Sequence, residues 1–173
     1  MKQETEEDML DFAKEVCQKY SRVKMLAEET QMQWRQDLEM AADSKYPGEK
    51  EMYDRQAEES LARYTALREW LKLADAAAFR IKDSKAQIVV RQHCLDRIPL
   101  KAVEFENGKH MGKTAVFYHK KIGLQQFSEE LFLQQGADAA AGKKVLQKLN
   151  FTNGNEPFLN FSFLTVHRFF AIL

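Results

Sequence analysis

The chain has 173 residues, enough for one well-packed domain or for a small domain with a helical extension. Gly (7) and Pro (3) are scarce, which argues against an all-β fold because such folds use both residue types in many tight turns. The formal net charge is +0, but residues 1–84 contain 14 Lys and Arg against 19 Asp and Glu, whereas residues 85–127 contain 8 against 3. The basic segment predicts a local anion-binding surface; the alternative is that the acidic and basic parts neutralise each other inside the fold.

Apolar residues recur at steps of three and four over residues 9–41, the spacing of one stripe on an amphipathic helix. A second stripe follows over residues 53–81, after a polar break at residues 43–48 that contains Pro47 and Gly48. Two helices joined by a short loop predict an antiparallel hairpin over residues 5–82, and a coiled-coil homodimer through the same stripes is the alternative. The first stripe consists of Met9, Phe12, Val16, Tyr20, Val23, Ala27, Thr30, Trp34, Leu38 and Ala41; the second consists of Tyr53, Ala57, Leu61, Tyr64, Leu67, Leu71, Ala74, Ala78 and Ile81.

Residues 84–127 predict three short helices. Asp83 and Ser84 can cap a helix over residues 85–95, Pro99 is placed to begin a second that ends near Gly108, and a third covers residues 113–126. Ser128 is expected to cap a further short helix, and residues 137–149 are expected to form another. The predicted class is therefore all-α, with an N-terminal hairpin and a compact helix-turn-helix-like bundle.

The last part of the chain, residues 128–173, ends in an apolar stretch over residues 158–173. This stretch is shorter than the roughly 20 residues that span a bilayer, so we expect a tail that packs on the body or on a partner, and no membrane insertion. Cys17 and Cys94 belong to no CxxC pair, and the acidic start of the chain has no apolar signal sequence. These features predict a cytoplasmic protein in a reducing compartment.

Motifs for catalysis are weak throughout the sequence. Residues 112–114 read Gly-Lys-Thr, but only three residues separate them from Gly108, whereas a phosphate-binding P-loop requires four intervening residues. The His and Cys residues do not have zinc-ligand spacing, and no Ser or Cys lies in a nucleophile motif. We therefore expect no enzyme activity, no catalytic residues, no cofactor and no metal site.

The predicted helix over residues 113–126 has Val116 and Ile122 as core candidates and a basic, hydroxyl-bearing opposite face. A recognition helix that enters the major groove needs such side chains near its start, where they reach phosphates and base edges. The alternative is a helical bundle whose last helix happens to be basic. The residues expected to contact DNA are Lys109, Lys113, Thr114, Tyr118, Lys120 and Lys121.

The segment 84–127 also resembles the helix-turn-helix of sigma-factor region 4. In particular it is similar to the small phage and prophage transcriptional regulators of the ArpU and RinA type. The resemblance implies binding of duplex DNA in a sequence-specific way, with activation of transcription through RNA polymerase. It rests on Ile88, Arg91, Asp96, Leu100, Val103, Gly108, Thr114, Val116, His119 and Leu124.

Two other classes of function fit the same sequence. In the first, the protein is a helical adaptor or structural protein whose hairpin pairs with another helix or forms a homodimer, and residues 84–127 only complete the bundle. In the second, it is a small inhibitor of a host protein, which docks through the apolar tail. The position of Lys113, Lys120 and Lys121 in the fold separates these classes, because DNA binding requires them to be exposed rather than paired with carboxylates.

Overall fold

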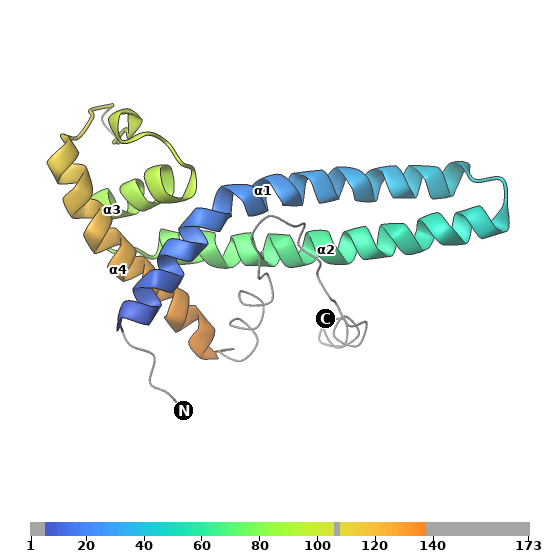
Figure 1. Cartoon of the computed structure of the whole chain (residues 1–173), viewed down its shortest axis with the longest axis horizontal. Helices are drawn as coiled ribbons and strands as arrows, with labels where there is room; N and C mark the ends of the chain where they lie inside the picture. Colours follow the sequence, from blue (N-terminus) through green and yellow to red (C-terminus); the bar gives the residue numbers. More distant parts are fainter. Residues whose placement is uncertain (1–5, 106–107, 138–173) are drawn as a thin grey trace. The chain divides into compact units, whose positions relative to one another are not determined.

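The computed structural model describes residues 6–105 and 108–137, and helices make up most of this part of the chain (Figure 1). The predicted all-α class is confirmed. No helix among the described residues is both long and apolar enough to cross a membrane. The elements are α1 (Glu6–Asp43), α2 (Pro47–Phe79), α3 (Ser84–Val89), the π-helical turn η1 (Val90–Leu95), the 3-10 turn η2 (Leu100–Ala102) and α4 (Lys113–Ala137).

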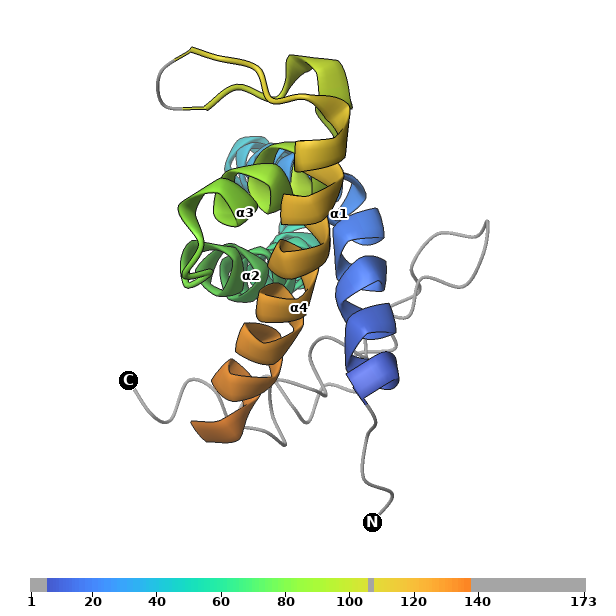
Figure 2. The ribbon, with the colours of Figure 1, turned by 90° about the vertical axis from the view of Figure 1, so that its left-hand side faces the viewer.

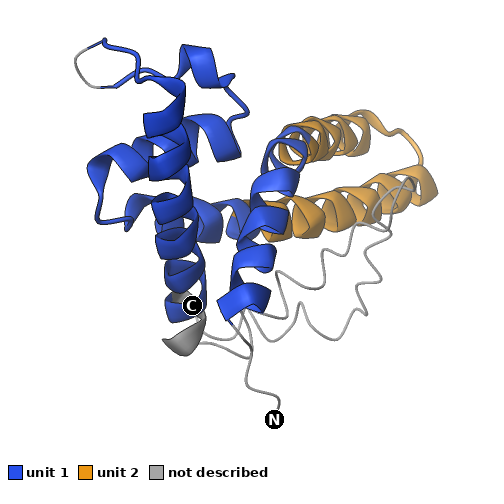
Figure 3. Ribbon diagram, turned by 60° about the vertical axis from the view of Figure 1, so that its left-hand side comes forward, with its two compact units in different colours: residues 1–25, 69–142 blue, residues 26–68, 143–173 orange. Residues whose placement is uncertain are grey.

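Contacts divide the chain into two compact units (Figure 3). Unit 1 comprises residues 1–25 and 69–142, and unit 2 comprises residues 26–68 and 143–173. The described part of unit 2 consists of residues 26–68. Helices α1 and α2 each contribute to both units. The division therefore cuts through the two long helices.

In unit 2, the two helical segments run antiparallel, and their contacts include one buried polar cluster (Figure 1). The rings of Trp34 and Tyr64 are stacked with their centroids 6.4 Å apart. The carboxylate of Asp37 accepts hydrogen bonds from Ser60 Oγ (2.9 Å) and Gln33 Nε2 (2.8 Å). These bonds compensate the burial of a charged group, which would be unfavourable without them.

The predicted core position of Leu38 is wrong, because Leu38 is 45% exposed while its neighbour Asp37 is 4% exposed. Both residues fit a spacing of three and four after Trp34, so the periodicity alone allows either one, and hydrophobicity favours Leu38. Ser60 and Gln33 reverse this preference by supplying hydrogen bonds to the carboxylate of Asp37. Leu61, also predicted to be buried, lies at the exposed surface.

In unit 1, the first half of α1 packs against residues of α2 and α4. Tyr20 is buried beside Trp70, and its hydroxyl donates a hydrogen bond of 2.7 Å to Asp75 Oδ1. Burial, followed by this hydrogen bond, raises the pKa of Tyr20, so the phenol stays protonated and keeps donating. Phe12 meets Phe132 of α4 edge to face, with ring centroids 6.0 Å apart.

The N-cap predicted for α3 is confirmed, whereas the connection predicted after α3 is wrong. Asp83 Oδ1 accepts a hydrogen bond of 2.7 Å from the backbone N–H of Ala86, as an N-cap does. Instead of the predicted helix from Pro99 to Gly108, only the three residues of η2 are helical among the described residues of this range. Val103 then has an extended backbone, which takes the chain out of the helix and buries the Val103 side chain completely in an apolar cluster with α3 and α4.

Helix α4 begins at Lys113, as predicted, but it continues through Ser128 instead of ending before it. The predicted separate helix capped by Ser128 is therefore wrong. The hydroxyl of Ser128 donates to the carbonyl of Gln125 within the same helix (2.7 Å), so this serine needs no helix terminus to satisfy its hydroxyl. The helix predicted over residues 137–149 and the apolar tail over residues 158–173 lie outside the described residues, except for Ala137, the last residue of α4.

Helical elements of unit 1 approach each other closely at Gly123, where α4 crosses α3 and η1 (Figure 2). A Cβ atom added to Gly123 would lie 2.6 Å from Val90 Cγ2 and 2.9 Å from the carbonyl oxygen of Ala86. The second distance involves backbone, which cannot move without shifting α3. Glycine therefore permits the contact that fixes α4 against α3.

Replacing Phe127 by Ala is expected to lower the free energy of unfolding by about 3–5 kcal/mol, because it leaves a large cavity in the core. Phe127 is 0% exposed, whereas Phe117 on the same helix is 47% exposed. Phe117→Ala is the matched control, with an expected change within about 0.5 kcal/mol. Urea unfolding of both variants measures the difference, and equal losses would contradict the burial of Phe127.

Gly123→Ala is expected to destabilise the protein by about 1–3 kcal/mol, although alanine favours helices more than glycine does. The clash with Val90 and Ala86 outweighs the gain in helix propensity. Gly48 in α2 has open space around it, with no atom within 4 Å of the position that a Cβ would take, so Gly48→Ala is expected to be neutral or stabilising by up to about 1 kcal/mol. Thermal unfolding should show that the melting temperature changes in opposite directions, or by clearly unequal amounts, in Gly123→Ala and Gly48→Ala.

Candidate nucleic-acid interface

The first turns of α4 present one exposed face that combines positive charge, hydroxyl groups and aromatic rings. Thr114, Phe117, Tyr118 and Lys121 follow the spacing i, i+3, i+4, i+7, which places them on one side of a helix, and all four are exposed. Lys113 is exposed at the start of the helix, with its Nζ atom 5.9 Å from the centre of the Phe117 ring. We call these five residues the basic-aromatic face.

Lys120 was expected on the same face, and the structure places it elsewhere. Its side chain is half-buried, and its Nζ atom lies 3.3 Å from Nε2 of His93 in η1. Because a helix turns by about 100° per residue, Lys120 and Lys121 point in clearly different directions. The structure thus brings together Lys113, Thr114, Tyr118 and Lys121 of the residues predicted to bind DNA. Lys109 lies in the loop that precedes the helix.

Sequence reasoning missed Phe117 and Lys85 as candidate binding residues. Phe117 is four residues after Lys113 and four before Lys121, so helical spacing alone could have placed it on the basic face. Lys85 lies on α3, and only the fold brings it near the loop before α4. No local signal in the sequence pointed to this proximity.

The loop between η2 and α4 is held in place by a network of backbone and side-chain contacts. Glu104 and His110 form an isolated antiparallel bridge, and the side chain of Gln92 bonds both backbone groups of Glu104, at 2.7 Å and 2.9 Å. Gly108 has a φ of +68°, a left-handed conformation that glycine adopts without strain. These contacts give the loop a defined position beside the first turns of α4.

Apolar packing supports the same loop from the side of the helices. Val89, Val103 and Val116 form a fully buried cluster that joins α3, the loop and α4. Phe105 and Met111 of the loop pack against it while partly exposed. The loop is therefore anchored to the helical body on both sides of the bridge.

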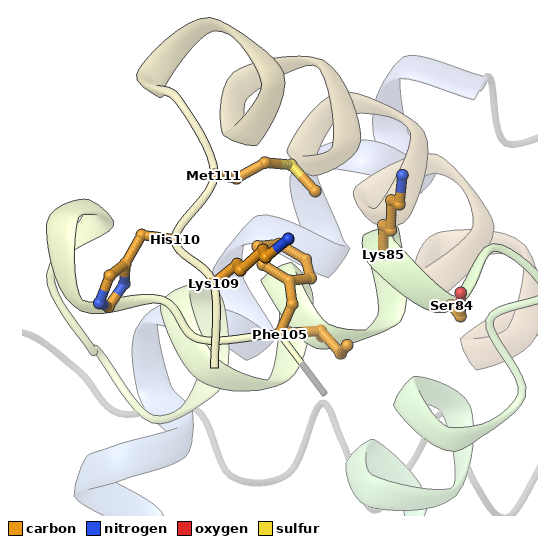
Figure 4. A pocket seen from close by; sticks show the side chains of 7 residues that line it. Ser84, Lys85, Phe105, Lys109, His110 and Met111 are labelled. Atoms are coloured by element: carbon orange, nitrogen blue, oxygen red, sulfur yellow. The ribbon is translucent and has the colours of Figure 1, made fainter. Parts of the chain in front are cut away.

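A pocket of about 400 Å³ lies between α3 and this loop (Figure 4). Lys85 from α3 and Lys109 from the loop line it together with Phe105 and Met111, which supply apolar surface. A space with two cationic groups beside apolar surface suits an anionic group better than a neutral polar one. The pocket adjoins the basic-aromatic face along the chain, since His110, which also lines it, is three residues before Lys113.

The lysines of α4 have no carboxylate partner among the residues that the structure describes. In the part of the chain that the structure describes, Lys113, Lys120 and Lys121 form no ion pair with Asp or Glu. Two other contacts of the segment 85–127 do involve carboxylates, since His119 lies 3.5 Å from Asp83 and Asp96 lies 4.0 Å from Lys24. Asp83 and Asp96 therefore do not neutralise the two lysines of the basic-aromatic face.

Among the described residues, no group of three or more His, Cys, Asp and Glu side chains is arranged to hold a metal ion. Comparisons with protein-family models, curated proteins and solved structures gave no match. The resemblance to sigma-factor region 4 thus remains a prediction. Function has to be inferred from the geometry of the basic-aromatic face and of the loop beside it.

Proposed function

We propose that the protein is a non-enzymatic DNA-binding protein that contacts duplex DNA through the basic-aromatic face of α4 and the adjacent loop. The observation that carries this proposal is the exposure of Lys113, Thr114, Tyr118 and Lys121 on one side of the first turns of α4. The two lysines have no carboxylate partner among the described residues. Exposed lysines at this density attract the phosphate backbone.

The chemistry of this face suits the major groove of duplex DNA, which admits one α-helix. Lys113 and Lys121 are about two turns apart and can reach phosphates, while the hydroxyls of Thr114 and Tyr118 lie between them and can reach phosphate oxygens or base edges. The N-terminal end of α4 also carries the positive end of the helix dipole, which favours a phosphate. Lys85 and Lys109 would add contacts to the backbone from the pocket beside the loop.

The biological role that we propose is regulation of transcription in a phage or mobile element. This part of the proposal comes from the resemblance of residues 84–127 to sigma-factor region 4 and its phage relatives. RNA polymerase is then the expected protein partner. The connection between α3 and α4 is longer than a tight helix-turn-helix turn, so the proposed contact depends on α4 and its loop rather than on that motif.

Replacing Lys113 and Lys121 together by Ala is expected to weaken binding to random duplex DNA and to flatten its salt dependence. Each lost phosphate contact lowers the slope of log K against log salt by about 0.9, so the double variant should lose about 1.8. Fluorescence anisotropy with a labelled duplex at several salt concentrations measures both quantities. Lys45→Ala with Lys50→Ala makes the same change of charge on unit 2 and is the matched control.

An unchanged slope in the Lys113/Lys121 variant would remove the basic-aromatic face from the interface. Equal changes in both double variants would mean that only the total charge matters. Circular dichroism of each variant establishes that the helices are intact. The expected result is a loss of slope confined to the α4 variant.

A second candidate function, association of two copies through the hairpin of unit 2, is favoured by exposed apolar side chains. Most stripe residues are buried within the chain, so a dimer would use the exposed apolar side chains of the same helices, among them the two stripe residues Leu38 and Leu61. Leu38 and Leu61 are exposed and directly follow Asp37 and Ser60, the hydrogen-bonded pair. In the described part of unit 2, residues 26–68, the exposed large apolar residues are Met32, Leu38, Met40, Tyr46, Met52 and Leu61.

If the hairpin mediates association, light scattering should give a dimer mass for the full chain and a monomer mass for the Leu38→Gln, Leu61→Gln variant. Glutamine keeps nearly the size and helix propensity of leucine while removing its apolar contact. Phe79→Gln, at an exposed position in unit 1, is the control and should remain a dimer. A monomeric wild-type protein at tens of micromolar would reject this candidate.

A further inference from the structure

The only two cysteines of the chain meet inside unit 1, although 77 positions separate them in the sequence. Cys17 is on α1 and Cys94 is in η1, and the two thiols are close enough for each to shift the pKa of the other. Neither residue is bonded in a disulfide, and both are buried. Nothing in the proposed DNA contact uses them.

Two hydrogen bonds join the segments that directly follow Cys17 and Cys94 in the chain. Arg97 Nη2 donates to the carbonyl of Gln18 (3.0 Å), and Ser21 Oγ donates to the carbonyl of Leu95 (2.8 Å). The two bonds involve residues close to Cys17 and Cys94 along the chain. The segments that carry the thiols are therefore held together independently of the sulfur atoms.

The segment around Cys94 has an uncommon backbone geometry. Cys94 lies in a π-helical turn, and Arg97, three residues later, has a φ of 60°, which is strained for a residue with a side chain. Single π-helical turns occur often at functional sites. The guanidinium contact of Arg97 with α1 holds this strained turn in place and keeps Cys94 beside Cys17.

The surroundings of the pair favour one nucleophile and one protonated partner. The hydrogen bond from Cys17, followed by the charges of Lys120 and Arg97, lowers the pKa of Cys94, while burial opposes this change. The same hydrogen bond, together with burial, raises the pKa of Cys17. The thiolate form is the reactive one, so Cys94 is the thiol that attacks first. Lys120, which the sequence predicts to be a DNA contact, thus has a structural reason to face inward.

We propose that Cys17 and Cys94 are a redox pair that peroxide converts reversibly into an intramolecular disulfide. The Cys94 thiolate attacks one oxygen of hydrogen peroxide; an S–O bond forms, the O–O bond breaks, and hydroxide leaves. The sulfur of Cys17 then attacks the sulfenic acid at Cys94, so that the S–S bond forms and the second hydroxide departs. The protons released by the two thiols convert both hydroxides to water, and the peroxide takes up the two electrons.

The burial of the thiols requires a small oxidant, because Cys17 is only 6% exposed and Cys94 only 5% exposed. Hydrogen peroxide is small enough to reach such sites, whereas a bulky disulfide must wait for local opening. The two sulfur atoms must approach to about 2.05 Å when the disulfide forms. The product would link α1 covalently to η1 and close a long loop of the chain.

The experiment treats the reduced, full-length protein with hydrogen peroxide, blocks remaining thiols, and measures the intact mass under denaturing conditions. We expect a monomer that has lost two hydrogen atoms and has no blocked thiol, and dithiothreitol should restore both thiols. Because the chain has two cysteines, this product can only be the Cys17–Cys94 disulfide. Oxygen addition without loss of hydrogen, or disulfides only between chains, would overturn the proposal.

The single variants Cys17→Ser and Cys94→Ser test the roles of the two thiols. The Cys17→Ser variant, which retains Cys94, should gain oxygen on treatment with peroxide. The Cys94→Ser variant, which retains Cys17, should react at least roughly tenfold more slowly, since only a thiolate reacts readily. The reverse order would overturn the assignment of the nucleophile. Serine differs from cysteine by one atom, and circular dichroism of both variants verifies their folding.

A measurement on the wild-type protein alone tests whether folding favours the disulfide between Cys17 and Cys94. In glutathione redox buffers, the disulfide should form roughly tenfold or more favourably in the folded protein than in urea, because the fold has already closed the loop. An equal or smaller equilibrium constant in the folded state would overturn the proposal. This outcome is independent of DNA binding, so failure of either proposal leaves the other intact.

Discussion

The arrangement of unit 1 depends on the close approach of α4 to α3 and η1 at Gly123. With no side chain at this position, the helix can rest against Val90 and the backbone of Ala86. Phe127, one turn later, is then completely buried on the same side of α4. This contact determines which side of α4 is covered, and therefore which side remains exposed for binding.

The loop before α4 extends the exposed surface because it is attached to the body at several points. Gln92 bonds both backbone groups of Glu104, and Val103 is buried with Val89 and Val116. Lys109 and the first lysine of α4 are consequently carried on a defined scaffold. A cationic surface that is already ordered loses less entropy on binding a polyanion than a flexible basic tail does.

The basic segment serves two physical purposes in the fold. Lys113 and Lys121 face outward, where charge attracts an anionic partner, whereas the half-buried Lys120 and the exposed Arg97 lower the pKa of Cys94. Only some of the basic residues in 85–127 therefore belong to the proposed binding surface. Lys113 and Lys121 support the proposed DNA binding, and Lys120 and Arg97 support the proposed redox chemistry of Cys94.

The sequence by itself determined the features that depend on neighbouring residues: two long helices, a break between them next to Pro47, the cap at Asp83 and the start of α4 at Lys113. The break is shorter than predicted, because Pro47 and Gly48 belong to the first turn of α2. Periodicity, caps and proline act over one or two turns and can be read locally. Only the tertiary structure decided that Asp37 is buried instead of Leu38, that Lys120 turns inward, and that Cys17 meets Cys94. Each of these outcomes depends on a partner distant in the sequence, such as Ser60, His93 or a second thiol, and local spacing contains no information about which partner will be near.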